Sequence, residues 1–187
     1  MAKRVFDIVV SFFGLIILAL PCLLIAIFVK ASSTGPAIFW STRIGKDSKP
    51  FQMPKFRSMR IDTPEVATDK LSLPEQYVTK TGAFLRKTSL DELPQLYSVF
   101  TGDMSLVGPR PALHNQFELI DLRMQKGIDR MRPGITGLAQ INGRDDIELA
   151  QKVALDLEYM KRANMGLDIQ IIVLTFFSII KSKNVAH

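Results

Sequence analysis

The chain has 187 residues, which is enough for one domain with a hydrophobic core. Its formal charge of +6 favours an anionic partner: a membrane surface, a phosphorylated substrate or nucleic acid. One cysteine, Cys22, excludes an internal disulfide, and with only two histidines there are too few ligands for a common structural zinc site. A metal ion bound by this chain would therefore be a hard, oxygen-liganded ion such as Mg²⁺.

The first predicted element is an uncharged, mostly apolar run from Ile8 to Val29, which is long enough to cross a bilayer. Pro21 lies within the run, where it removes a backbone hydrogen bond and kinks a helix. We therefore predict a re-entrant helix over residues 1–31 that bends at Leu20-Pro21, with a membrane-spanning anchor as the alternative. Basic residues at both ends favour the re-entrant form, because the positive-inside bias would hold both ends on the cytoplasmic side: Lys3, Arg4, Lys30, Arg43 and Lys46.

A β-hairpin is predicted next, after the turn-forming residues 32–36. Its strands are short extended segments within residues 37–45 and 50–59, joined by a polar loop. Pro54 places the second strand at the edge of a sheet, because proline cannot donate a ladder hydrogen bond. The basic residues of the hairpin either line a phosphate site or face water: Arg43, Lys55 and Arg57.

Two adjacent carboxylates, Asp91 and Glu92, follow the cations Arg86 and Lys87. On a helix, neighbouring side chains point about 100° apart, so both carboxylates can reach one metal ion or phosphate. A divalent ion would offset their repulsion, and one carboxylate can then act as a nucleophile. The alternative is a helix start in which Ser89 and Glu92 form a capping box, an arrangement that is compatible with chemistry at Asp91.

Two later segments are candidates for phosphate binding. Prolines on both sides of Arg110 stiffen the backbone and would suit a bidentate grip on phosphate; a solvated surface arginine is the alternative. Residues 132–144 combine glycines with flanking arginines, so free backbone N–H groups and fixed cations can form a nucleotide or diphosphate cradle. This second segment matches neither the Walker loop nor the dinucleotide fingerprint.

The remaining pattern is mainly helical. An exposed loop is predicted over residues 60–76, and helices over 79–87, 114–126 and 145–163. Residues 169–180 are apolar but too short to span a membrane, which predicts a buried or interfacial helix. Three basic residues share one helical face, which is typical of a solvated surface or of contact with anionic lipid: Arg123, Lys126 and Arg130. No nucleic-acid module is indicated, because the aromatic residues are not interleaved with the basic ones.

Five segments together resemble the bacterial monotopic phosphoglycosyl transferases, often described simply as bacterial sugar transferases. The resemblance covers essentially the whole chain and is closest to small members that consist of the catalytic domain alone. The matching segments are KRVFD at 3–7, KFRSM at 55–59, SLDELPQ at 89–95, GDMSLVGPRP at 102–111 and RPGITGLAQINGR at 132–144.

The resemblance implies a helix-rich α/β (α+β) fold. A re-entrant membrane helix over residues 1–31 would precede a catalytic domain over residues 32–187, with a short β-hairpin and amphipathic interfacial helices. Several family members have a serine before the proline of the re-entrant helix, where this chain has Leu20. Leucine cannot bond to the backbone groups that the proline leaves open, so the bend would depend on Pro21 and on packing.

The resemblance also implies an activity and a location. Members of the family transfer a phosphosugar from a UDP-sugar to a polyprenol phosphate, typically undecaprenyl phosphate, and release UMP. They act at the cytoplasmic face of the bacterial inner membrane, in contact with membrane lipid, and no nucleic acid is involved. A membrane-surface adaptor that binds anionic lipid without catalysis is the alternative function, and metal-dependent UMP release distinguishes the two.

Site residues are carried over by matching positions. Asp91 would be the nucleophile that forms an aspartyl-phosphosugar intermediate, and Glu92 would either orient Mg²⁺ or act as a base. Both carboxylates would be ligands of Mg²⁺, and Arg86 would contact phosphate. The implied substrate-binding residues are Arg86, Lys55, Arg57, Pro109, Arg110, Pro111, Arg132, Thr136, Gln140 and Arg144.

Overall fold

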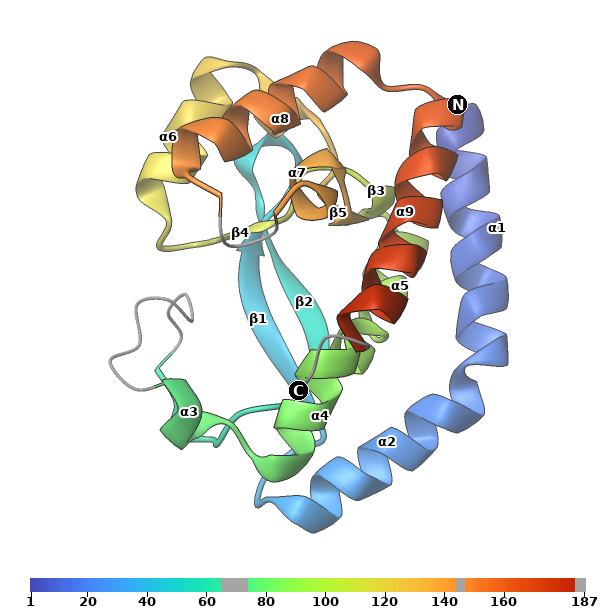
Figure 1. The fold of residues 1–187 in the computed structure, drawn as a ribbon, viewed down its shortest axis with the longest axis vertical. Coiled ribbons are helices and arrows are strands. Elements are labelled where there is room, and N and C mark those ends of the chain that lie inside the picture. Colours follow the sequence, from blue (N-terminus) through green and yellow to red (C-terminus); the bar gives the residue numbers. More distant parts are fainter. Residues whose placement is uncertain (65–73, 144–146, 184–187) are drawn as a thin grey trace.

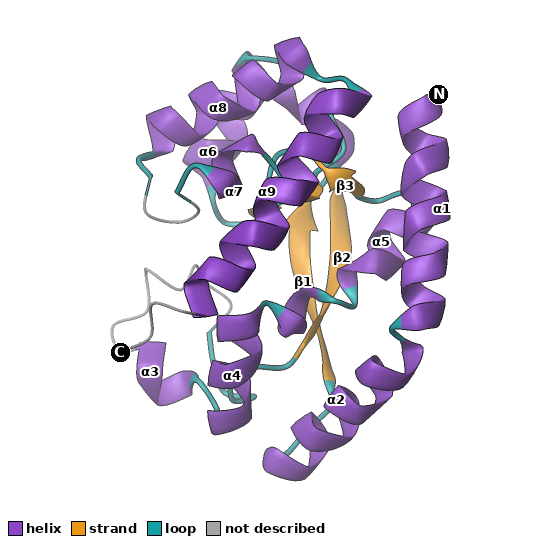
Figure 2. Cartoon of the chain, turned by 45° about the vertical axis from the view of Figure 1, so that its right-hand side comes forward, coloured by secondary structure: helices purple, strands orange, loops and turns teal. Residues whose placement is uncertain are grey.

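The computed structural model of the chain describes residues 1–64, 74–143 and 147–183. The two N-terminal helices run along one side of the molecule, and a twisted β-hairpin lies at its centre among the other helices (Figures 1 and 2). The described residues are mainly helical with two small sheets, which confirms the helix-rich α/β class. Most of the predicted loop at 60–76, and Arg144, lie outside the described residues.

The N-terminal helices α1 (Ala2–Ile17) and α2 (Ala19–Ser32) meet at a bend of 60°. Pro21 lies in the first turn of α2, where it has no N–H to donate to the carbonyl of Ile17 and crowds that carbonyl with its ring. The bend therefore falls at Leu18, before the predicted Leu20-Pro21 step. Within the described residues no single helix has the length and hydropathy to cross a bilayer, whereas α1 and α2 meet that criterion only as a bent pair.

The polarity of α1 is inverted relative to a helix of a soluble protein. Its buried residues are Asp7 and Ser11, while Phe13 and Ile17 are 56% and 72% exposed. The carboxylate of Asp7 accepts hydrogen bonds from the Ser105 hydroxyl at 2.9 Å and from the backbone N–H of Leu106 at 3.1 Å. Polar contacts thus help to hold α1 against the rest of the chain together with Phe6, which packs against the main core, while most of the other large apolar side chains are exposed.

The predicted hairpin is confirmed. Strands β1 (Ile38–Ile44) and β2 (Pro50–Phe56) pair antiparallel and are joined by the 3₁₀ turn η1 (Lys46–Ser48). The sheet order is β2-β1-β4, with β4 at Ala112–Leu113, so Pro54 does lie in an edge strand. A second sheet pairs β3 (Ser105–Val107) with β5 (Gly134–Thr136) in parallel.

The segment that carries the acid pair is a tight turn between two helices. Helix α4 (Lys80–Thr88) agrees with the predicted helix over 79–87, and the 3₁₀ turn η3 (Leu90–Glu92) leads into α5 (Gln95–Thr101). The short helix α3 (Pro74–Tyr77) precedes them. The predicted capping box is wrong, because Ser89 ends α4 with a φ of 56° and its side chain caps no helix. The backbone N–H of Ser89, which Glu92 would have to cap, instead donates to the carbonyl of Arg86, and the Glu92 carboxylate is bound by two cations described below.

The C-terminal half is built from helices α6 (Phe117–Gln125), α7 (Leu138–Ile141), α8 (Leu149–Arg162) and α9 (Met165–Lys183), with the 3₁₀ turn η4 at Ile128–Arg130. Helix α9 begins before the predicted range of 169–180; it buries Ile171 and exposes Phe176 and Phe177. The predicted basic surface stripe is wrong for Arg123, which is buried because Asp156 on α8 pairs with it.

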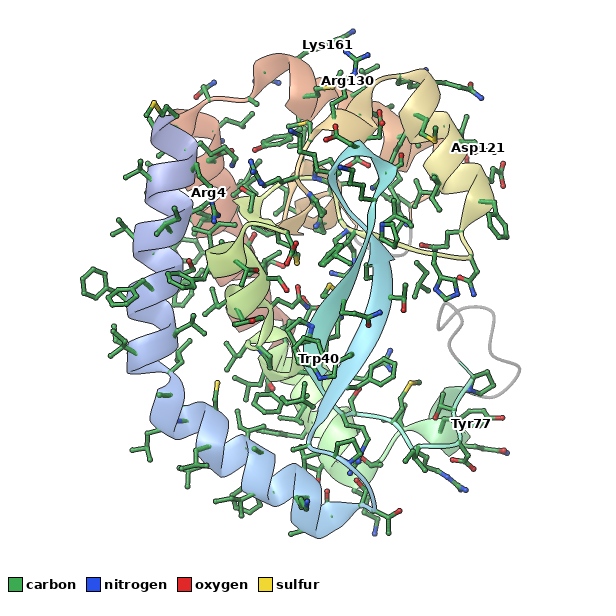
Figure 3. The ribbon with its side chains drawn as sticks, turned by 180° about the vertical axis from the view of Figure 1, so that it is seen from behind. Arg4, Trp40, Tyr77, Asp121, Arg130 and Lys161 are labelled. Atoms are coloured by element: carbon green, nitrogen blue, oxygen red, sulfur yellow. The ribbon has the colours of Figure 1, made fainter. Side chains whose placement is uncertain are left out.

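The main hydrophobic core joins α5, the β3–β5 sheet, α8 and α9. Its fully buried members include Val99, Met104, Val107, Tyr159 and Ile171. Arg4 fastens α1 to this core by donating to the carbonyls of Val99 and Phe100 near the end of α5 (Figure 3). The core therefore sets the position of α5, and with it the η3 turn that immediately precedes α5.

Candidate active site

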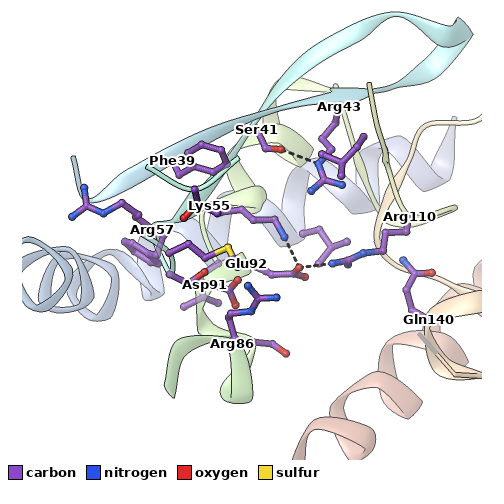
Figure 4. A pocket seen from close by; sticks show the side chains of 18 of the residues that line it. Phe39, Ser41, Arg43, Lys55, Arg57, Arg86, Asp91, Glu92, Arg110 and Gln140 are labelled. Carbon is purple, nitrogen blue, oxygen red and sulfur yellow. Dashed lines mark hydrogen bonds and ion pairs between the residues drawn. The ribbon is translucent and has the colours of Figure 1, made fainter. Parts of the chain in front are cut away.

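A cavity of about 600 Å³ opens between the hairpin, the η3 turn, the Arg110 turn, α7 and α9. This volume lies within the range of small-molecule sites. Figure 4 shows side chains converging on it from these separate segments. The predicted site residues that line it are Lys55, Arg57, Arg86, Asp91, Glu92, Arg110, Thr136 and Gln140.

Glu92 is held by two cations. Its Oε1 atom accepts a hydrogen bond from the Lys55 ammonium at 2.8 Å and another from Nη2 of Arg110 at 3.0 Å (Figure 4). Burial alone would raise the pKa of Glu92, but Arg110 and Lys55 outweigh that effect and hold the pKa well below its ordinary value. Glu92 is therefore ionised throughout the neutral range, and it joins strand β2 to the Arg110 turn.

Asp91 has the opposite environment. Its side chain is buried, and among the described residues no cation lies within 4.0 Å of its carboxylate. Burial raises the pKa of Asp91, the adjacent Glu92 charge adds to that rise, and the more distant cations Lys55 and Arg86 counter it only in part. Of the two carboxylates in the cavity, Asp91 is thus less engaged by cations and more available to a ligand.

The cations around Asp91 come from three separate segments. Lys55 lies on β2, Arg86 on the last turn of α4, and Arg110 on the turn between β3 and β4. Burial lowers the pKa of Lys55, and its ion pair with Glu92 opposes that shift. A cavity whose walls carry these positive charges suits a diphosphate, because Arg and Lys bind phosphate oxygens through charge-assisted hydrogen bonds.

Other predicted residues have different positions. Arg57 lies on the cavity wall, but its buried guanidinium donates to the backbone and side-chain oxygens of Ser33, at 2.8 Å each. Arg132 is exposed, does not line the cavity, and donates to the carbonyl of Gly102. Pro109 and Pro111 do not line it either; they flank Arg110 in the chain. Arg144 is outside the described residues.

The contribution of α9 to the cavity was not predicted from the sequence. Thr175 and Ser178 line the cavity, and the hydroxyls of Thr136 and Thr175 lie 2.6 Å apart. The sequence feature that could have indicated it is the spacing of Thr175 and Ser178, which lie three residues apart in a mostly apolar run and so share one face of the helix. Nearby, both amide atoms of Gln140 are buried and form no hydrogen bond within the part of the chain that the structure describes, so this wall offers a donor and an acceptor.

The donor set fits a magnesium ion that is shared with a substrate. Among the described residues there is no cluster of three or more His, Cys, Asp or Glu side chains. Mg²⁺ commonly takes one or two carboxylates together with substrate phosphates and water, and Asp91 supplies one such carboxylate. Glu92 also lines the cavity, and its Oε1 atom is bound by Lys55 and Arg110, so its role as a metal ligand stays a prediction.

The chain is 44% identical over 184 residues to UDP-glucose:undecaprenyl-phosphate glucose-1-phosphate transferase of Escherichia coli (strain K12), covering 94% of this chain and 39% of that protein. It is 40% identical over 189 residues to galactosyl transferase CpsE of Streptococcus agalactiae serotype III (strain NEM316), covering 93% and 41%. The chain thus spans about two fifths of the length of these two relatives.

A third relative is similar over most of its own length. Exopolysaccharide production protein ExoY of Rhizobium meliloti (strain 1021) is 37% identical over 198 residues, which cover 98% of this chain and 87% of that protein. The family model described as bacterial sugar transferase matches residues 1–182. The chain therefore belongs to the bacterial sugar transferase family, as its motifs predicted.

Proposed function

We propose that this chain transfers a phosphosugar from a UDP-sugar to a polyprenol phosphate such as undecaprenyl phosphate, with release of UMP. The observation that carries the proposal is a buried carboxylate, Asp91, which has no cation within 4.0 Å among the described residues and lies in a cavity lined by Lys55, Arg86 and Arg110. The name of the Escherichia coli relative, a UDP-glucose:undecaprenyl-phosphate glucose-1-phosphate transferase, supports the choice of donor and acceptor.

In the first step, an oxygen of the ionised Asp91 carboxylate attacks the β-phosphorus of the UDP-sugar. A bond forms between that oxygen and phosphorus, the bond to the bridging oxygen breaks, and its electron pair leaves with UMP. Arg86, Arg110 and Lys55 stabilise the charge on the diphosphate. A buried carboxylate suits this role, because little water has to be removed before it attacks.

In the second step, a phosphate oxygen of the lipid acceptor attacks the phosphorus of the aspartyl-phosphosugar. The bond to the Asp91 oxygen breaks, which regenerates the carboxylate and yields a polyprenyl diphosphosugar. A phosphate monoester is already largely ionised at neutral pH, so this attack needs no general base. Glu92 then acts as an anchor for Lys55 and Arg110, and its predicted role as a base is unnecessary.

Magnesium has a limited part in this scheme. Asp91 and the diphosphate oxygens would hold the ion, with water completing its coordination. When bound, Mg²⁺ would supply additional charge neutralisation for the diphosphate and the leaving UMP. Lys55 and Arg110 each have N–H groups beyond the one bound to Glu92, and these can donate to the diphosphate. The protein cations and the ion would then act on the same group.

The N-terminal helices suit a place in one leaflet of the membrane. The bent pair α1–α2 exposes most of its large apolar side chains, apart from Val29, and buries Asp7 and Ser11, a pattern expected where lipid surrounds a helix. Lys3 and Lys30 lie near opposite ends of the pair, so both ends would stay at the cytoplasmic face of the inner membrane. The bend would turn the chain back to the surface it entered from, beside the lipid acceptor.

Intact-protein mass spectrometry tests the proposal. Detergent-solubilised protein is mixed with Mg²⁺ and a panel of UDP-sugars without acceptor. We expect the mass of a phosphosugar on the wild type and on Asp121→Asn, which removes an exposed carboxylate, but not on Asp91→Asn. An adduct that survives in Asp91→Asn would overturn the assignment of the nucleophile. Absence of both adduct and UMP, with acceptor present, would favour the non-catalytic adaptor that binds anionic lipid.

A further inference from the structure

The turn that carries Arg110 is fixed through its carbonyl groups. Pro109 and Pro111 have no N–H, so this turn has few donors of its own. Each of its three carbonyls instead accepts a hydrogen bond from another segment. The carbonyl of Pro109 accepts from Gly134 N at 2.9 Å, that of Arg110 from Nη1 of Arg123 at 2.8 Å, and that of Pro111 from Nη1 of Arg43 at 3.2 Å.

Of these donors, Arg123 is itself held most firmly. It lies on α6 with its side chain 9% exposed, and its Nε and Nη2 atoms donate to Oδ2 of Asp156 at 3.0 and 2.6 Å. Asp156 lies on α8 and is 2% exposed. The third nitrogen, Nη1, is thereby directed at the carbonyl of Arg110. The guanidinium of Arg123 thus connects Asp156 on α8 to the backbone of Arg110, which lines the cavity.

A buried ion pair alone adds little to stability, because the loss of hydration offsets most of the attraction. Two apolar residues of similar volume would fill the same space between α6 and α8. They could not donate to the carbonyl of Arg110, which would then lose its partner. The ion pair therefore provides a hydrogen bond to the Arg110 carbonyl that an apolar pair could not provide.

We propose that Arg123, oriented by Asp156, is a positioning residue for Arg110 in the transfer reaction. This inference rests on the proposed function, in which Arg110 stabilises the diphosphate. Arg123 fixes the backbone of Arg110, and the Arg110 side chain extends to Glu92 at the cavity wall (Figure 4). Loss of the bond to its carbonyl removes one of the three hydrogen bonds that fix this turn, so the turn can shift and move the guanidinium relative to Asp91.

The test separates positioning from folding with two variants. Arg123→Met/Asp156→Leu replaces the pair with apolar residues and removes the donor to Arg110. Arg123→Lys keeps a cation beside Asp156 but loses the planar fork.

Because a misplacement of about 1 Å can cost about 100-fold in rate, we expect both variants to lower kcat/KM for adduct formation by about 10- to 100-fold. The thermal unfolding midpoint should stay close to wild type in at least one of them. Arg162→Met, which removes an exposed pair with Glu158 on α8, is the matched control.

The deciding readout is a double-mutant cycle with Arg110→Ala. If Arg123 acts through Arg110, the Arg123 variants cause no further loss in the Arg110→Ala background. Additive losses would overturn the positioning role while leaving the proposed function intact, because Arg110→Ala would still be impaired. Wild-type activity of Arg110→Ala would contradict the role of Arg110 in the proposed function, and with it the positioning role.

Discussion

Asp91 and Glu92 are neighbours in the chain, yet their carboxylates have opposite surroundings. Glu92 binds Lys55 and Arg110 through one oxygen, whereas Asp91 is buried with no cation within 4.0 Å among the described residues. The pKa of Glu92 is accordingly depressed and that of Asp91 is raised. In the proposed reaction, this difference gives the two acids different tasks: Asp91 attacks the substrate, and Glu92 holds the cations in place.

The separate task of Glu92 predicts the behaviour of Glu92→Gln. The amide keeps the shape but not the charge, so Lys55 and Arg110 lose their shared anchor. We expect the rates of adduct formation and of transfer to the lipid to fall together, each by about 10- to 100-fold. Single-turnover measurements of UMP release and of lipid product check this, with Glu118→Gln as a control on an exposed carboxylate. Selective loss of the transfer to lipid would instead identify Glu92 as a base.

The raised pKa of Asp91 predicts the pH dependence of adduct formation. Only the ionised carboxylate attacks, so the rate should rise with pH through the pKa of Asp91, above the ordinary aspartate value of 3.8. Lys55 lowers this pKa, so Lys55→Met should move the midpoint of the pH–rate curve to higher pH and also reduce the maximal rate. Single-turnover rates from acidic to neutral pH measure both. An unchanged midpoint in Lys55→Met would show that another group controls the acid limb.

The bend between α1 and α2 predicts the effect of Pro21→Ala. Alanine restores an N–H for the carbonyl of Ile17 and removes the ring that crowds it, so a continuous helix becomes more favourable by about 3 kcal/mol. We expect spin labels at Val10→Cys and Phe28→Cys, in a Cys22→Ser background, to move apart when Pro21 is replaced. An unchanged distance would mean that packing, and not Pro21, sets the bend of 60°.

The buried Asp7 predicts a stability effect far from the cavity. Asp7→Ala leaves the Leu106 N–H and the Ser105 hydroxyl without their acceptor, which should cost about 1–3 kcal/mol of unfolding free energy. Denaturant titration in detergent measures the loss, and Val9→Ala on the exposed side of α1 is the control. Equal effects of the two substitutions would contradict a specific role for Asp7.

The parts of the fold that depend on local patterns were predictable from the sequence. The hairpin follows from extended segments around a polar turn, and α4 from a helical pattern that begins after Thr79, whose side chain caps it. Lys55 and Arg110 were candidates for phosphate binding from the residues themselves, and the resemblance to a family assigned them and Arg86 to one site with Asp91. The cavity then showed that Lys55, Arg86 and Arg110 do lie around it.

Features that depend on distant partners were not predictable. Arg123 has the spacing of a surface stripe, and nothing near it in the chain reveals that Asp156 lies opposite. The capping box at Ser89 failed because the cations bound by Glu92 come from other segments of the chain. The position of the bend was accessible in principle, because proline disturbs the carbonyl four residues before it and so ends α1 at Ile17.

Isotope exchange tests the covalent step at Asp91 most directly. Protein is incubated with Mg²⁺, an unlabelled UDP-sugar that forms the adduct, and radiolabelled UMP, without any lipid acceptor. A two-step reaction predicts that label enters the UDP-sugar, because UMP can reverse the first step, and that Asp91→Asn abolishes the exchange. If UMP is released only when the lipid acceptor is present and no label is exchanged in its absence, transfer is direct and the aspartyl intermediate is wrong.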